Sequence, residues 1–314
     1  MNSLSNHSHR QPAFYEWWYI HCACADGTSL NLVIHETDIF GLIHEPYLSL
    51  SLYRPGQPVR YLKRPLACGS ISRQGEYLRV AGGLVSETAD HLCLNIPFAN
   101  EGHLQGQINK LSAPLAIADG ILYQDRANNL SSYWLVPVPH ATFQATLTLD
   151  GSVTPLSGVA YHDHQWGNVP LQAFVSDWVW GHLSNAQRSL VFFHLLTQTG
   201  AWVSRVGLVE KNGRYTATSL QTDYAHQLMD YSQPDQFDNR PTVQLFNQLI
   251  SVTFPVSPSQ LMRQRVGEQH PGFSSSYLRW ATTAHYQAGQ QSETLYGITE
   301  YIRIRPERYE QLPP

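Results

Sequence analysis

The 314-residue sequence predicts an all-β protein built from antiparallel sheets. Hydrophobic and polar residues alternate with a period of two along most of the chain, as they do in strands with one buried face. Short Asp-Gly, Asn-Gly and Pro-Gly sequences separate the alternating runs. Because no regular helical pattern lies between these runs, they indicate antiparallel barrels or sandwiches.

The alternating segments are the expected strands. Residues 47–53 show the pattern most clearly, because three leucines point to one side while tyrosines and serines point to the other. The other expected strands cover residues 29–40, 91–98, 141–150, 189–196, 201–210, 277–288 and 294–305. Only residues 219–231 and 258–266 could form helices, and both segments are short.

The two halves of the chain have similar patterns of aromatic residues, although no exact repeat is visible. Each half opens with a Trp-rich segment, at residues 16–19 in the first and 177–180 in the second. The expected boundary lies near residues 170–175, so we predict domains of residues 1–170 and 171–314. Because no long linker separates them, the two domains should pack closely.

Composition narrows the classes of function. Charged residues make up 14% of the chain, against roughly 25% in typical soluble proteins, and aromatic residues make up 11%. Such a chain suits the enclosure of an apolar small molecule, and equally the packing of many strands. The net charge of −4 and the absence of a basic run argue against nucleic acid as a partner.

Sequence features also bear on location and cofactors. No stretch reaches the ~20 apolar residues of a membrane-spanning helix, although peripheral contact with a membrane stays open. The first residues are polar and His-rich and lack the apolar core of a signal peptide, so a cytoplasmic location is expected by default. The chain has no glycine fingerprint for a nucleotide, and we expect no cofactor.

The densest polar cluster has the sequence Tyr-His-Asp-His-Gln-Trp-Gly at residues 161–167. In an extended strand, Tyr161 and Asp163 face one side, while His162 and His164 face the other. A carboxyl group in an apolar cavity has a raised pKa, because the ionised form is poorly solvated there. Asp163 would then stay protonated near neutral pH and act as a general acid, as protonation of an alkene requires.

Two other interpretations of this cluster stay open. In the first, the segment is a turn whose Asp and His side chains cap backbone groups and tie strands together. In the second, His162 and His164 bind a metal ion through their i, i+2 spacing on one strand face. No second tight cluster supplies an obvious third ligand, so we predict no metal site.

Aromatic and polar side chains also alternate in other segments. Trp17 and Tyr19 share one strand face, with Glu16 on the opposite face. Glu300 lies inside an apolar strand and is expected to be a buried carboxylate with a partner. Strands of this kind line ligand cavities that have aromatic walls and a few polar groups. The candidate substrate-binding residues are Glu16, Trp17, Tyr19, His35, Trp166, Trp178, Trp180, His182 and Glu300.

Four motifs resemble those of the carotenoid 1,2-hydratase (hydroxyneurosporene synthase) family and the related AttH-type lipocalin-like domain. They are Glu-Trp-Trp-Tyr at residues 16–19, Asp-His-Gln-Trp-Gly at 163–167, Asp-Trp-Val-Trp-Gly-His at 177–182 and Gly-Ile-Thr-Glu-Tyr at 297–301. The motifs follow the family's order and span nearly the whole chain. The resemblance implies two tandem lipocalin-like antiparallel β-barrels packed side by side, with a ligand pocket near their junction.

The resemblance also implies chemistry on apolar polyenes. Carotenoid hydratases hydrate an isolated double bond by acid initiation, and natural-product cyclases and Diels–Alderases have similar barrels. Carried over to this chain, the resemblance implies that Asp163 is the acid and that Tyr161 assists it. His162 and His164 are the other two candidate catalytic residues, and as neighbours of this pair they would shape the pocket.

Three hypotheses of function follow. The favoured one is a cofactor-independent hydratase or cyclase, a lyase or isomerase that acts on an apolar polyene, isoprenoid or polyketide. The first alternative is a Diels–Alderase-type pericyclase that holds a folded substrate without moving a proton. The second is a lipid- or isoprenoid-binding protein without turnover. Replacing Asp163 by Asn separates the carrier from the acid catalyst, because a carrier keeps its ligand affinity without the acid.

Overall fold

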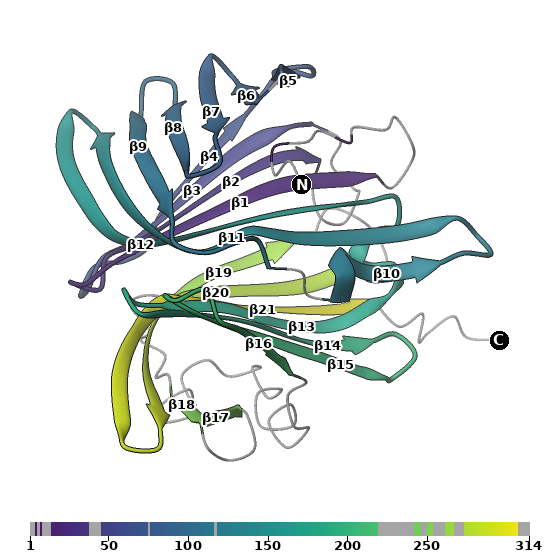
Figure 1. The fold of residues 1–314 in the computed structure, drawn as a ribbon. Helices are drawn as coiled ribbons and strands as arrows, with labels where there is room; N and C mark the ends of the chain where they lie inside the picture. Colours follow the sequence, from purple (N-terminus) through teal and green to yellow (C-terminus); the bar gives the residue numbers. More distant parts are fainter. Residues whose placement is uncertain are drawn as a thin grey trace.

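A computed structural model describes residues 4, 7, 14–37, 45–74, 76–115, 118–218, 242–245, 250–253, 261–266 and 273–306. It shows two curled antiparallel sheets, the first above the second in Figure 1. Most strands pair with their neighbours in sequence, as the alternating pattern and the turn residues predict. The prediction of an all-β fold is confirmed.

The first sheet contains twelve strands among the described residues. At its centre, β1 (Tyr15–Cys24) pairs with β12 (Ser152–Gly167), which also pairs with β11 (Leu130–Leu149). The flanking strands are β2 (Ser29–Thr37), β3 (Tyr47–Tyr53) and β4 (Arg60–Pro65) on one side, and β9 (Gly102–Lys110), β8 (His91–Pro97), β7 (Gly83–Glu87), β6 (Tyr77–Val80) and β5 (Ile71–Gln74) on the other; β10 (Ile121–Asp125) pairs with β11.

The second sheet contains nine strands within the described part of the chain. At its centre, β13 (Val175–Ser184) pairs with β21 (Gln291–Pro306), which forms a long hairpin with β20 (Phe273–Ala288). The remaining strands are β14 (Arg188–Thr197), β15 (Trp202–Glu210) and β16 (Tyr215–Thr218) beyond β13, and β17 (Thr242–Leu245), β18 (Ile250–Thr253) and β19 (Leu261–Val266) beyond β20.

Strand β1 is buried along its whole length because both of its faces are covered. One face packs with leucine, isoleucine and valine side chains inside the curl of the first sheet. The other face packs with aromatic side chains from both sheets, so that a second core fills the space between them. The centre of the first sheet therefore carries two separate environments, one on each face of β1 and β12.

The expected strands agree with the observed ones over the described residues, and residues 38–40 of the expected strand 29–40 lie outside them. The exceptions concern helices. Residues 261–266 were expected to belong to a helix, but they form β19, which pairs with β20. That expectation is wrong because the backbone ladder with β20 outweighs a weak helical pattern. The other expected helix, residues 219–231, lies outside the described residues. The helical turns in the described part are the short 3₁₀ segments η1 (Ala118–Gly120) and η2 (Leu171–Ala173).

The first sheet ends at Gly167, and the second begins at Val175 after a connection that contains η2. A domain division at residue 170 falls within this connection and stays a prediction. Among the described residues, no helix has the length and apolar character needed to cross a membrane.

Candidate active site between the sheets

The register between β1 and β12 determines which side chains enter the space between the sheets. Tyr19 lies opposite Asp163, and His21 lies opposite Tyr161. Since paired residues of neighbouring strands share a face, these four side chains point toward the second sheet. His162 and its neighbour His164 point into the curl of the first sheet. The predicted division of this segment into two faces is confirmed.

Asp163 and Tyr161 form a buried acid pair. The Tyr161 hydroxyl donates a hydrogen bond of 2.8 Å to Oδ2 of Asp163, and both residues are almost fully excluded from solvent. Burial raises the pKa of Asp163 to about 8, against the lowering effect of the hydrogen bond from Tyr161. Oδ1 has no hydrogen-bond partner among the described residues. The raised pKa favours the protonated carboxyl group at neutral pH.

A second polar group joins the two sheets at Glu300. Its Oε1 accepts hydrogen bonds from the Tyr19 hydroxyl at 2.7 Å and from Nε of Arg279 at 2.6 Å. Arg279 also donates to the Asn31 amide oxygen at 2.5 Å and to the Tyr277 hydroxyl. The expectation that Glu300 is a buried carboxylate with a partner is confirmed.

Aromatic rings surround the acid pair. The ring centroid of Trp180 lies 5.1 Å from that of Tyr19 and 5.5 Å from that of Tyr161. The His182 ring stacks on Tyr161 at 4.5 Å. Burial holds the pKa of His182 well below its ordinary value, so the ring is neutral at neutral pH. Its Nδ1 lies 3.2 Å from Nδ1 of His21, which links the two sheets a second time.

Trp17, Trp178 and His35 belong to the margins of the same space. Trp17 and Trp178 pack in the core between the sheets. The His35 ring is buried, stacks on Tyr47 at 4.1 Å and lies 6.5 Å from the Trp17 ring. The structure therefore brings nine of the residues singled out from the sequence to the acid pair or its surroundings: Asp163, Tyr161, Tyr19, Trp180, His182, Glu300, Trp17, Trp178 and His35.

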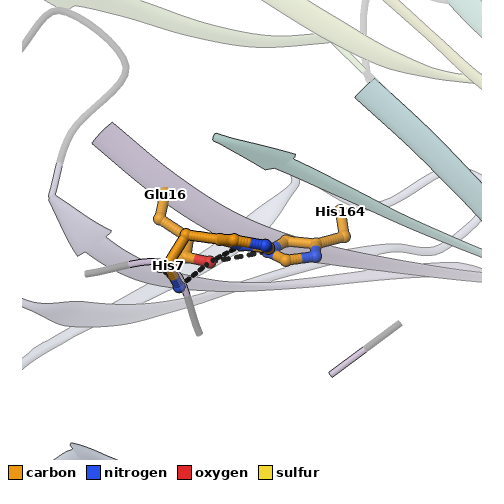
Figure 2. Close-up of side chains that lie close together, drawn as sticks. All are labelled: His7, Glu16 and His164. Carbon is orange, nitrogen blue, oxygen red and sulfur yellow. Dashed lines mark hydrogen bonds and ion pairs between the residues drawn. The ribbon is translucent and has the colours of Figure 1, made fainter. Parts of the chain in front are cut away.

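The remaining candidates lie on the opposite face of the first sheet. Glu16 accepts a hydrogen bond from Nε2 of His164 at 2.8 Å, and Nδ1 of His7 lies 3.0 Å from the same carboxylate oxygen (Figure 2). The Trp166 ring stacks on His7 at 4.0 Å. His162 bonds through Nδ1 to the backbone carbonyl of Tyr19 at 2.9 Å. The strands thus separate these four predicted site residues from Asp163.

Sequence reasoning missed Arg279, Tyr277 and Asn31. The signal for Arg279 was present, because a two-residue turn at Gly289 and Gln290 sets the register of the β20–β21 hairpin. Counting back from that turn places Arg279 opposite Glu300. Asn31 carries no comparable signal, since its contact with Arg279 joins strands of different sheets.

Comparison with curated proteins gives two relatives by sequence. The chain is 34% identical over 76 residues to the quinolone epoxide rearrangement protein asqO of Emericella nidulans, which is 23% of this chain and 21% of that protein. It is 31% identical over 83 residues to the quinolone epoxide rearrangement protein penF of Penicillium thymicola. This match covers 26% of this chain and 23% of penF. The chain thus matches less than a quarter of each relative. No family model matches the sequence.

Comparison with solved structures concerns the whole fold. An AttH-type protein from Nitrosomonas europaea matches with a TM-score of 0.60 at 14% identity, over 94% of this chain and 93% of that one. CghA with Sch210972 matches with a TM-score of 0.64 at 8% identity, over 94% and 89%. Kievitone hydratase from Nectria haematococca matches with a TM-score of 0.55 at 10% identity, over 93% and 90%. The chain therefore has the fold of the AttH-type lipocalin-like proteins, as its four motifs predict.

Proposed function

We propose that this protein is an acid catalyst that rearranges or hydrates an oxygenated, largely apolar natural product without a redox cofactor. Its sequence relatives are named for the rearrangement of quinolone epoxides, and one protein of the same fold is named as a hydratase. Both kinds of reaction begin with proton delivery to the substrate. The observation that carries the proposal is the buried Asp163 carboxyl group between the sheets, which Tyr161 bonds through one oxygen and whose burial raises its pKa.

Asp163 is prepared to give up its proton to a substrate. Tyr161 occupies one carboxyl oxygen as a donor, so the acidic proton belongs on the other oxygen. That oxygen, Oδ1, has no protein acceptor within the described residues. A substrate oxygen beside Oδ1 therefore receives the proton without displacing an existing hydrogen bond.

For an epoxide, the proton passes from Oδ1 to the ring oxygen, one carbon–oxygen bond breaks, and its electron pair stays on oxygen. Positive charge then develops on carbon, where the faces of Tyr19, Tyr161 and Trp180 stabilise it. Migration of a group and loss of a proton to the Asp163 carboxylate complete an isomerisation and restore the acid. In hydration, the same acid protonates an alkene, water adds to the cation, and the added water returns a proton.

Arg279 and Glu300 serve this chemistry by positioning Tyr19. The Tyr19 hydroxyl donates to Glu300, which directs the ring edge toward Trp180. Glu300 is in turn held by Arg279, whose charge it compensates. We assign Arg279 and Glu300 as positioning residues.

The test uses the full-length protein, a quinolone epoxide as probe substrate, and product analysis by liquid chromatography and mass spectrometry. Asp163→Asn should lower kcat at least 100-fold, because an amide donates no proton to an epoxide oxygen. The matched control is Asp177→Asn. Asp177 is a buried aspartate that pairs with Ser176 and Tyr301, and its variant should retain activity. Equal activity of the Asp163→Asn variant and the wild type would exclude acid catalysis by this residue.

A solvent isotope experiment separates the acid mechanism from pericyclic templating. Reaction of a hydratable substrate in D₂O should place deuterium on the carbon that receives the proton. If the wild type forms its product without incorporating deuterium, the result would favour conformational templating.

A further inference from the structure

The opposite face of the first sheet holds a compact group of metal-ligating side chains. His7, Glu16 and His164 each offer one ligand atom, and these atoms lie within 4.8 Å of one another. Figure 2 shows the two imidazole rings converging on the Glu16 carboxylate. The residues come from three separate parts of the chain: the N-terminal segment, β1 and β12.

The spacing of the ligand atoms suits a single cation after small movements. Oε1 of Glu16 lies 3.0 Å from Nδ1 of His7 and 2.8 Å from Nε2 of His164. A transition metal with bonds of about 2.1 Å separates its ligand atoms by roughly 3.0–3.4 Å. These two separations are hydrogen-bond lengths, so a bound ion has to widen them by a few tenths of an ångström, and all three ligand atoms already lie within 4.8 Å of one another.

The rings are fixed before any ion binds. Trp18 stacks on the His164 ring at 4.9 Å, and Trp166 stacks on the His7 ring at 4.0 Å. The backbone N–H of His7 also donates to both oxygens of Glu16, at 2.9 Å each. Such preorganisation lowers the entropic cost of collecting ligands from distant parts of the chain.

A second carboxyl group, that of Glu36, stands beside this group. The ladder between β1 and β2 has an irregularity that sets Glu36 between the paired residues His35 and Thr37. The charge of Glu16 acts on the Glu36 carboxyl, and Oε2 of Glu36 is buried without a hydrogen-bond partner in the described part of the chain. Within the same part, Glu16 pairs with histidines and with neither arginine nor lysine.

We propose that His7, Glu16 and His164 bind a divalent first-row transition metal ion. Two imidazoles and one carboxylate form a donor set that accepts Zn²⁺ or Co²⁺. The expectation of no metal site rested on a missing third ligand beside His162 and His164; the structure instead groups His164 with His7 and Glu16 and leaves His162 out.

The role of the ion follows from where its ligands sit. Bound there, it ties the N-terminal segment at His7 to the paired strands β1 and β12. Asp163 points to the other face of the same sheet, so the site is separate from the proposed acid chemistry. The proposal is therefore independent of the proposed function, and its test needs no substrate.

The test measures metal binding by isothermal titration calorimetry on the metal-stripped full-length protein, with Zn²⁺ as the probe. We expect one equivalent to bind, and His7→Ala and Glu16→Gln each to weaken the affinity at least tenfold. Zn²⁺ should also raise the Tm of the wild type more than that of either variant. The control is His91→Ala, which removes a histidine that begins β8, contacts Thr88 and is not part of the metal-ligating group; this variant should bind as the wild type does.

Co²⁺ provides a second readout, because its visible absorption reports the ligand set. The spectrum of the Co²⁺-loaded wild type should show imidazole coordination that His7→Ala alters. His7 is half-exposed, so its replacement leaves the fold intact. Absence of stoichiometric binding of both ions, or binding that His7→Ala and Glu16→Gln leave unchanged, would overturn the proposal.

Discussion

Replacing Asp163 by Asn removes an ionisable group whose burial costs stability at neutral pH. Burial raises the pKa of Asp163 from 3.8 to about 8. Between these two pH values the folded state keeps a proton that the unfolded state has lost. Folding stability therefore falls as the pH rises through this window. Asn has nearly the same shape, still accepts the hydrogen bond from Tyr161, and has no proton to retain.

The size of the effect follows from the width of the window. Each pH unit above 3.8 costs the wild type about 1.4 kcal/mol relative to the Asn variant, so the difference at pH 7 is about 4 kcal/mol. Near pH 4 the difference should approach zero. The Asn variant should thus be more stable than the wild type and catalytically inactive. This combination is expected where burial of a catalytic group costs stability.

Urea unfolding followed by tryptophan fluorescence, at a series of pH values from 4 to 8, measures this difference. The free energy of unfolding of the two proteins should diverge steadily as the pH rises. A gap that does not change with pH, or an Asn variant that is less stable than the wild type at pH 7, would refute the reasoning. Asp177→Asn is the control. It replaces one of the two carboxylate oxygens that accept hydrogen bonds from Ser176 and Tyr301 by an amide donor, and it should lower stability.

Three further predictions concern the site between the sheets. The rate of the wild type should be level below pH 8 and fall about tenfold per unit above it, as Asp163 ionises; a pH profile of kcat/KM checks this. Tyr161→Phe should raise the pKa of Asp163 further by removing a donor to the carboxylate, and its alkaline limb should move to higher pH in the same profile. Arg279→Met should leave Glu300 buried without its cation and lower the free energy of unfolding by about 3–5 kcal/mol in urea titrations.

The alternation of side chains was sufficient to predict the faces of β12. A strand has a period of two wherever it lies, so Tyr161 and Asp163 had to share one face as soon as the segment was extended. The same logic placed Trp17 and Tyr19 together on β1. Local patterns thus determine which side chains accompany one another.

The element that packs on each face of a strand cannot be predicted from the sequence of that strand. The sequence around β1 does not reveal that one face meets the curl of the first sheet and the other meets the second sheet. The contacts of Arg279 with Asn31, and of His164 with Glu16, join residues far apart in the chain. Glu16 was therefore grouped with Trp17 and Tyr19 as a substrate contact, although the structure places it on the opposite face.

One motif residue has a structural explanation that sequence alone did not provide. Gly297 belongs to the closing motif and lies opposite Leu183 where β21 pairs with β13. A side chain at this position would collide with the backbone carbonyl of His182. The glycine thus permits the close approach that brings Glu300, three residues later, to Tyr19.

The protonation state of Asp163 is the claim on which the acid mechanism depends. Infrared difference spectroscopy between the wild type and Asp163→Asn measures it directly and needs no substrate. At pH 7 the wild type should show a protonated-carboxyl band that the variant lacks, and the band should titrate away near pH 8. An Asp163 band that is already that of a carboxylate at pH 6 would contradict the account.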